Sequence, residues 1–159
     1  MIDGWRLCRR PFADLTGEGA RRFGGRWNPA GWPVVYFADH PALAVLEVRV
    51  HLDLPHELLP DDYVLMRARL PTKPTVIAEV PEQPAMAGQD WLRERRTPLL
   101  RVPSVLVPYA GNFLLNPEHP GARKASIVST EPFRFDTRLW EPAMQRPVIR
   151  NRLPGAGPA

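Results

Sequence analysis

The sequence predicts an α+β fold, in which a single domain holds a mixed, mostly antiparallel sheet and a few short helices. Two observations predict this class. Runs of β-branched and aromatic residues recur between turn residues, which is typical of short strands. Helical stretches are few and do not follow each strand in turn, as a parallel βαβ fold would require. We therefore expect about six strands and two or three short helices.

Length and composition set the size of this fold. With 159 residues, of which 44% are apolar, the chain can bury one ordinary hydrophobic core. The 20 prolines are scattered between apolar runs, so they mark the ends of short elements. We expect the domain to span residues 1–145 and the residues 146–159 to form a flexible C-terminal tail.

Two strands are predicted in the first part of the chain. Trp5–Arg10 is expected to be a short opening strand. Val34–Ala38 is a continuous apolar run, as expected for a strand covered on both faces. Because side chains alternate along a strand, Tyr36 shares a face with Val34 and Ala38. This tyrosine is either an ordinary core residue or part of a site.

A helix is predicted directly after this strand. Asp39 is a candidate N-cap, Pro41 suits the first turn, and Ala42–Leu52 contains no internal glycine or proline. An apolar stripe is formed at helical spacing by Leu43, Leu46, Glu47 and Val50. Glu47 is therefore expected to point inward with its apolar neighbours, whereas Arg49 points elsewhere.

A loop with at most one helical turn is predicted for residues 51–62, followed by a strand and a helix. The strand Tyr63–Leu70 has a half-buried pattern, with its core face formed by Val64, Met66, Ala68 and Leu70. Within Pro81–Arg96 we expect a short exposed helix that touches the core through Trp91 and Leu92.

The remaining strands are predicted around two proline-containing segments. Thr75–Val80 extends the sheet, and two further strands are expected at Ala125–Thr130 and Phe133–Phe135. Leu99–Val107 is strand-like, but Pro103 cannot donate to a ladder. The strand is therefore expected to bulge or to lie at an edge beside Ser104, and bulges often re-aim side chains toward active sites.

Asn112–Pro120 is predicted to be a turn-rich segment because it contains asparagines and prolines. The amides of Asn112 and Asn116 are candidates for hydrogen bonds to a polar ligand. Alternatively, both side chains satisfy the backbone of their own loop.

Charge and cysteine content restrict the function classes. A formal net charge of +4 favours an anionic partner, which could be nucleic acid, a nucleotide or an acidic protein surface. Cys8 is the only cysteine, so no internal disulfide forms, and no signal peptide or membrane span is visible. We expect a cytoplasmic location. The four histidines lack zinc-ligand spacing, so no metal site is expected.

The loop from Gly17 to Gly31 is a candidate anion site. Its glycines allow close approach of the backbone to a ligand, and Arg21, Arg22 and Arg26 offer guanidinium groups for phosphate oxygens. A solvated turn before the strand is the simpler alternative.

Glu47 is a candidate site residue because a carboxylate inside an apolar stripe is costly unless it has partners. It either forms a structural ion pair with a nearby arginine or lines a cleft in which a ligand supplies the partners. The pattern of this helix alone does not choose between them.

Several ordered strings carry a family resemblance: GEGARRFGGRWNPAGWPVVYFAD, ALAVLEVRVHL, LRVPSVLVPYAGNFLLNPEHP and FRFDTRLW. Together they resemble the RES-domain family of bacterial toxins, over the chain from Trp5 to Trp140. Several motifs in a fixed order are more specific than one short pattern. The segment from Pro71 to Leu92 departs from the family pattern.

The resemblance implies an enzyme with a fold similar to that of ADP-ribosyltransferases. It implies a toxin that degrades NAD as its substrate, with no other cofactor, by transferring the ribose to water or phosphate. The family's arginine, glutamate and serine fall on Arg26, Glu47 and Ser104, and Tyr36 takes the place of the aromatic residue that positions nicotinamide. The implied partner is an antitoxin of the Xre helix-turn-helix type, which would be the only link to DNA.

Substrate-binding roles are also implied for residues near these four. Arg6 would hold the pyrophosphate or an incoming phosphate, and the other candidates are Gly25, Trp27, Asn112 and Asn116. Transfer of ADP-ribose to a specific protein is the alternative within the same class. A basic nucleic-acid-binding module is a distant alternative, because no helix-turn-helix, zinc-finger or RNP-like motif is present.

Overall fold

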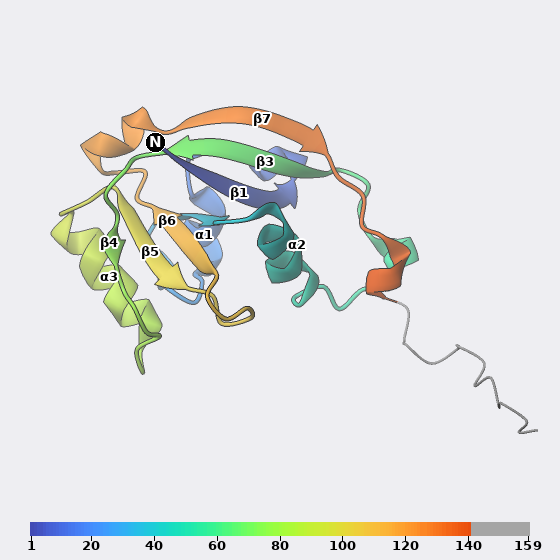
Figure 1. The fold of residues 1–159 in the computed structure, drawn as a ribbon, viewed down its shortest axis with the longest axis horizontal. Helices are drawn as coiled ribbons and strands as arrows, with labels where there is room; N and C mark the ends of the chain where they lie inside the picture. Colours follow the sequence, from blue (N-terminus) through green and yellow to red (C-terminus); the bar gives the residue numbers. More distant parts are fainter. Residues whose placement is uncertain (141–159) are drawn as a thin grey trace, which may run out of the picture.

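The computed structural model describes residues 1–140, so the predicted tail at 146–159 lies outside the described residues. One seven-stranded sheet runs in the order β4-β5-β6-β2-β1-β3-β7 (Figure 1). The strands are β1 (Ile2–Arg9), β2 (Val35–Ala38), β3 (Tyr63–Leu70), β4 (Thr75–Val76), β5 (Leu99–Pro103), β6 (Gly111–Leu115) and β7 (Ser126–Pro132). The α-helices are α1 (Glu18–Phe23), α2 (Pro41–Arg49) and α3 (Pro84–Glu94). The predicted α+β class is confirmed.

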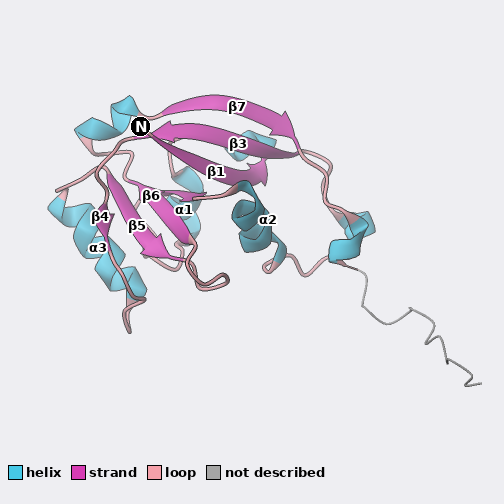
Figure 2. Cartoon of the chain, in the orientation of Figure 1, coloured by secondary structure: helices cyan, strands magenta, loops and turns pink. Residues whose placement is uncertain are grey.

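Short 3-10 turns connect several of these elements. They are η1 (Arg10–Phe12), η2 (His56–Leu58), η3 (Pro120–Lys124) and η4 (Thr137–Leu139). The turn η2 confirms the single helical turn expected in the loop 51–62. Figure 2 shows how loops and short turns surround the one sheet.

The sheet opens between its two central strands. Strand β1 pairs with β3 along its whole length, from Ile2↔Leu70 to Arg9↔Tyr63, but with β2 only at Trp5↔Ala38. All pairings are antiparallel except that of β4 with β5. Beyond the pair Trp5↔Ala38, no strand pairing joins β1 and β2. The two strands diverge there, which leaves room for side chains and a ligand between them.

The core follows the alternation of the strands. The predicted inner face of β3, made of Val64, Met66, Ala68 and Leu70, is fully buried. Helix α3 covers the other half of the sheet, because Trp91 and Leu92 pack with Trp27, Leu100 and Leu114. The predicted contact of α3 with the core is confirmed, and the helix begins at Pro84.

In the second half of the chain, the predicted turn is wrong, and of the two alternatives at Pro103 only one holds. Residues 111–115 form β6 and not a turn, because Phe113 and Leu115 are buried between β2 and β5. Strand β5 ends at Pro103 without the expected bulge, and the edge alternative describes Pro103, since β4 pairs only with Leu100 and Arg101. The register shift lies between Arg67 and Ala68, where β3 meets β7. Pro103 is tolerated because it is the last residue of its strand.

The helix α2 also differs from its prediction in two details. Its N-cap is His40, whose Nδ1 accepts from the Ala42 amide, while Asp39 Oδ2 accepts from the Gly111 amide. Leu46 and Val50 are 38% and 49% exposed, so they do not form a core stripe. The buried residues of α2 are Leu43 and Ala44, in its first half.

The glycine-rich segment is not entirely a loop, since it contains the short helix α1. Glu18 forms ion pairs with Arg21 and Arg22, one turn later on the helix. These hydrogen bonds from the arginines lower the pKa of Glu18 to about 2. Both guanidinium groups therefore bind Glu18 on the surface. Of the three arginines in the predicted anion site, this leaves Arg26 as the candidate.

Candidate active site

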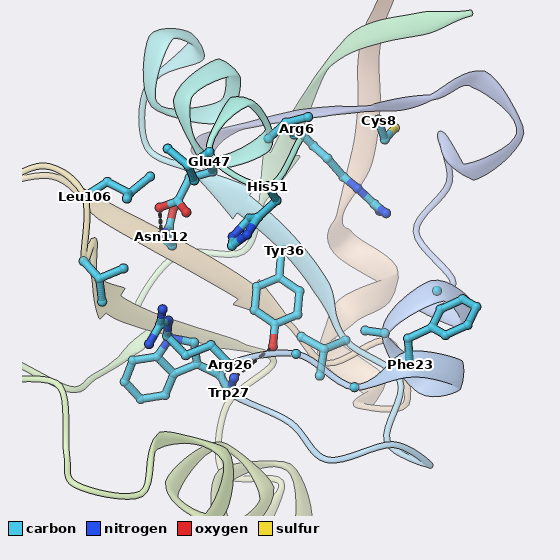
Figure 3. Close-up of a pocket in the computed structure, with 18 of the residues that line it drawn as sticks. Arg6, Cys8, Phe23, Arg26, Trp27, Tyr36, Glu47, His51, Leu106 and Asn112 are labelled. Atoms are coloured by element: carbon cyan, nitrogen blue, oxygen red, sulfur yellow. Dashed lines mark hydrogen bonds between the residues drawn. The ribbon is translucent and has the colours of Figure 1, made fainter. Parts of the chain in front are cut away.

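A cavity of about 590 Å³ lies where β1 and β2 diverge, and we call it the main cavity. Its lining comes from β1, β2, β6, both helices α1 and α2, the turn before β2, and the end of β5. Seven of the predicted site residues line it: Arg6, Gly25, Arg26, Trp27, Tyr36, Glu47 and Asn112. Segments far apart in the sequence therefore meet here (Figure 3).

Glu47 enters the cavity from α2. Its Oε1 accepts hydrogen bonds from Asn112 Nδ2 at 2.8 Å and from Ser104 Oγ at 3.3 Å. Within residues 1–140 it forms no ion pair, and Oε2 has no hydrogen-bond donor. The structural ion pair considered from the sequence is therefore not formed with any described residue. The carboxylate is held by neutral groups and keeps one oxygen free for a ligand.

Ser104 holds Glu47 from outside the cavity lining. Its Oγ accepts from the backbone amides of Leu106 and Val107 at 3.1 and 3.2 Å, so its proton is directed to Glu47. The Ser104 amide donates to the Ala110 carbonyl, which closes the loop between β5 and β6. The structure therefore supports a positioning role for this serine.

Tyr36 presents its ring to the cavity, while its hydroxyl is used internally. The Oη donates to Asn28 Oδ1 at 2.6 Å and accepts from the Trp27 amide at 3.2 Å. Asn28 must present its oxygen to Tyr36, because its Nδ2 donates to three carbonyls, those of Ala20, Pro29 and Trp32. Burial raises the pKa of Tyr36 to about 12. The hydroxyl is thus a neutral anchor and the ring is the ligand-facing part.

Gly25 allows the turn before β2 to approach this tyrosine. Gly25 and Asn28 pair as an isolated bridge, with Arg26 and Trp27 at the tip. A Cβ at position 25 would lie 2.8 Å from Tyr36 Oη, so a side chain would push the turn away. Gly25 therefore contributes to the shape of the cavity wall.

Trp27 belongs to the core as well as to the cavity lining, since only 3% of it is exposed. Its carbonyl packs against α3 so closely that a Cβ at Gly88 would lie 1.8 Å from the oxygen. The turn is therefore fixed from behind by α3.

Two arginines face the cavity without a carboxylate partner in the described part of the chain. Arg26 forms no hydrogen bond or ion pair there, and Arg6 Nη1 donates only to the Asp14 carbonyl at 3.3 Å. Arg21 and Arg22, by contrast, are paired with Glu18. Of the arginines in the glycine-rich segment, only Arg26 is placed to meet an anion in the cavity.

A smaller cavity of about 160 Å³ lies behind Glu47, between β1, β2 and α2, and we call it the inner cavity. It shares Arg6, Tyr36, Glu47 and Asn112 with the main cavity. Its other walls are mostly apolar side chains, including those of Trp5, Leu7, Phe37 and Ala44. Glu47 and Tyr36 therefore stand between two adjoining spaces.

Asn116 is placed elsewhere. It does not line either cavity, and only 2% of it is exposed. Its Oδ1 accepts from the Glu118 amide at 3.0 Å, and its own amide donates to the Pro98 carbonyl. The alternative that it satisfies its own loop therefore describes this residue, and we remove it from the candidate site.

Three residues of the site were not identified from the sequence. Asn28 is buried beneath the turn. Its position between Trp27 and Pro29 in the sequence predicted only a turn. His51 lines the main cavity just after α2, between Glu47 and Tyr36 in Figure 3. Cys8 also lines it, and burial raises the pKa of this thiol, which keeps it neutral. The spacing of four residues between Glu47 and His51 could have indicated a shared helix face.

Within residues 1–140, no group of three or more histidine, cysteine, aspartate or glutamate side chains lies close enough together to hold a metal ion. In the same part of the chain, no helix has the length and apolar character needed to cross a bilayer.

Comparisons with known proteins extend these findings. The chain is 39% identical over 145 residues to the protein named Toxin Res of Pseudomonas putida, covering 86% of this chain and 98% of that one. It is 38% identical over 139 residues to the Prs ADP-ribosylating toxin of Sphingobium sp., covering 79% and 86%. A stretch of 35 residues is 57% identical to the NAD(+) phosphorylase MbcT of Mycobacterium bovis, covering 21% and 19%.

One solved structure has the same fold. It is the crystal structure of the M. tuberculosis MbcT–MbcA toxin–antitoxin complex, with a TM-score of 0.65, 19% identity and 84% of each chain covered. The model of the RES domain family matches residues 4–136 of this chain. The chain therefore belongs to the RES domain family.

Proposed function

We propose that the chain is a toxin of a toxin–antitoxin pair that degrades NAD by cleaving the bond between nicotinamide and ribose. The observation that carries the proposal is the state of Glu47, a carboxylate held by two neutral donors, with one free oxygen, beside a cavity of ligand size. The name Toxin Res of one relative supports the role as a toxin, and the name NAD(+) phosphorylase MbcT of another supports the reaction.

The cleavage needs little more than a fixed negative charge. As the bond breaks, its electrons move to the ring nitrogen of nicotinamide, which leaves as a neutral molecule and needs no proton. Positive charge then develops on the ribose, as in glycoside cleavage. Glu47 stabilises that charge or binds the 2′-hydroxyl through Oε2. The ring of Tyr36 stacks against nicotinamide, an arrangement in keeping with a similarity to ADP-ribosyltransferases.

The remaining groups fit the rest of a dinucleotide. Arg6 and Arg26 have no carboxylate partner within residues 1–140 and would bind the pyrophosphate or an incoming phosphate. Gly25 and Trp27 shape the pocket, while Asn112 and Ser104 keep Glu47 in place. NAD is the substrate in this proposal, and no further cofactor or metal is required.

The proposed partner is an antitoxin of the Xre helix-turn-helix type, and contact with DNA would occur only through it. The structural relative was crystallised as a toxin–antitoxin complex. Around the mouth of the main cavity, apolar side chains remain exposed: Phe12, Phe23, Val50, Val105 and Leu106. Such a rim suits a protein partner that covers the opening. The pair would act in the cytoplasm, where NAD is available.

The test is to incubate the purified protein with NAD, with and without inorganic phosphate, and to measure released nicotinamide and identify the ribose product. Hydrolysis gives ADP-ribose, and phosphorolysis gives its phosphorylated form. Glu47→Gln should lower the rate by roughly 100-fold or more. Glu57→Gln, at an exposed carboxylate in η2, is the matched control. Intact NAD under both conditions would refute the proposal.

Transfer of ADP-ribose to a specific protein is the second candidate, because a relative of similar identity is named an ADP-ribosylating toxin. Incubation with labelled NAD and a cell extract separates the two, since only transfer places label on a protein. A nucleic-acid-binding module would instead show salt-sensitive DNA binding by the isolated chain.

A further inference from the structure

The C-terminal half of α2, which carries Glu47, is only partly held by the core, because Val48 packs against it while Leu46 is exposed. The buried residues of this helix are Leu43 and Ala44, both in its first half. In the second half Leu46 is 38% exposed, and Val50, just after the helix, is 49% exposed. Hydrogen bonds to Glu47 hold this half from the cavity side. A contact on its outer face restricts the position of the carboxylate further.

That contact comes from residues Phe133–Trp140, which we call the C-terminal clasp. Arg49 Nε donates to the Leu139 carbonyl at 3.1 Å, and the guanidinium carbon lies 4.0 Å from the centre of the Trp140 ring. Arg49 Nη1 also donates to the Leu52 carbonyl at 3.3 Å. Because residues two positions apart lie about 200° apart around a helix, Arg49 and Glu47 leave α2 on nearly opposite sides.

The clasp is itself anchored to the rest of the molecule. Trp140 Nε1 donates to the Leu54 carbonyl at 2.8 Å, and a ring nitrogen of His56 lies 3.1 Å from the Phe135 carbonyl. Phe135 is 7% exposed and packs edge-on against Tyr63 of β3, with ring centres 5.2 Å apart. In Figure 1 the red end of the described chain lies beside the green loop that follows α2. The clasp therefore connects the end of α2 to the sheet.

We propose that Arg49 and Trp140 are positioning residues, which fix the C-terminal half of α2 and thereby the carboxylate of Glu47. This inference rests on the proposed function for its kinetic part. Neither Arg49 nor any residue of the clasp lines either cavity. Both therefore act on the reaction only through α2. Displacement of a catalytic group by about 1 Å can cost roughly 100-fold in rate, because the transition state requires a fixed geometry.

The kinetic experiment compares Arg49→Ala with wild-type protein in the nicotinamide-release assay. We expect kcat to fall roughly 10- to 100-fold, with KM for NAD within about threefold of wild type. Trp140→Ala should behave in the same way. Arg49→Lys should recover part of the rate, because it keeps the cation over Trp140 but not the planar fork. The matched control is Arg93→Ala, which removes an arginine paired with Asp90 on α3.

A double-mutant cycle separates positioning from general destabilisation. If Arg49 acts through Glu47, adding Arg49→Ala to Glu47→Gln leaves the residual rate unchanged. Equal losses from Arg49→Ala in both backgrounds would overturn the proposal, as would a kcat unchanged in Arg49→Ala. If Arg49→Ala does not fold, Trp140→Phe takes its place, because it keeps an aromatic ring and loses only the bond to Leu54.

Hydrogen exchange gives a readout that does not depend on NAD. In Arg49→Ala the amides of residues 50–52, which close the end of α2, should exchange faster, while those of β3 keep their wild-type rate. Unchanged exchange at residues 50–52 would refute the proposal that Arg49 and the clasp fix the end of α2. If wild-type protein leaves NAD intact but the exchange result is as expected, the proposed function fails while the clasp stands.

Discussion

The main cavity has two walls that are held in different ways. The carboxylate wall consists of Glu47 and Asn112, with Ser104 behind them; all three are half-buried, and both Asn112 and Ser104 donate hydrogen bonds to Glu47. The turn wall consists of residues 25–28 and Tyr36, and it is fixed by packing and by the amide of Asn28, which is 1% exposed. Changes in the carboxylate wall should therefore alter chemistry at little cost in stability. Changes in the turn wall should alter stability first.

The strongest test of this difference is Asn28→Ala. It removes the buried amide that donates to the carbonyls of Ala20, Pro29 and Trp32 and accepts from the Tyr36 hydroxyl. We expect the free energy of unfolding to fall by about 3 kcal/mol, because a buried network is broken. Urea unfolding measures this loss. A loss no larger than that of Asn112→Ala, from the carboxylate wall, would remove the distinction between the walls.

The contact of the turn wall with α3 is tested by Gly88→Ala. Its new methyl group would lie 1.8 Å from the Trp27 carbonyl oxygen, so the helix or the turn must shift. We expect a loss of about 1–3 kcal/mol in the free energy of unfolding. Gly19→Ala, in α1, meets nothing within 4 Å and should instead gain up to about 1 kcal/mol. A gain in both variants would show that α3 does not press on the turn.

Within the carboxylate wall, two variants rank the donors to Glu47. Asn112→Ala removes the 2.8 Å bond and should lower kcat roughly 10- to 100-fold, with KM for NAD nearly unchanged. Ser104→Ala removes the 3.3 Å hydrogen bond and should lower kcat by less than about 10-fold. Steady-state nicotinamide release measures both. The reverse order would mean that the serine contacts the substrate directly.

The smallest expected effect concerns Tyr36 at high pH. Burial raises the pKa of its hydroxyl to about 12 in the folded protein, above the ordinary value of 10. The unfolded chain therefore loses this proton first, and the stability contributed by the neutral hydroxyl is complete below pH 10 and is lost as the pH rises to 12. Relative to Tyr36→Phe, wild-type protein should lose up to about 2 kcal/mol over this window. Parallel pH curves for the two proteins would contradict this.

Several elements were predictable because their signals are local. The alternation in residues 63–70 specified a strand with one buried face, and the apolar run before Asp39 specified another. The inward direction of Glu47 was also predicted, but the apolar stripe predicted around it is not buried at Leu46 and Val50. Leu46 and Val50 are apolar but exposed, because the helix end faces the cavity mouth and the clasp, and helical spacing cannot distinguish those surfaces from a core.

The errors have a common physical cause, which is competition among partners distant in the sequence. Asn112 was assigned to a turn on its residue type, but pairing with β2 and β5 places it in a strand. Asp39 was a plausible N-cap, yet it binds the Gly111 amide and leaves the cap to His40. Both outcomes depend on a neighbour about 70 residues away, and local propensity contains no information about such a neighbour.

The sequence by itself determined the fold class, the positions of the main strands along the chain, and the identity of the arginine, tyrosine, glutamate and serine that carry the family resemblance. Only the tertiary structure decided which of these face the cavity, that Ser104 acts behind Glu47, and that Asn116 lies elsewhere. The physical reason is that residue type fixes what a side chain can bind. The packing of β1, β2 and α2 around the opening in the sheet fixes what it meets.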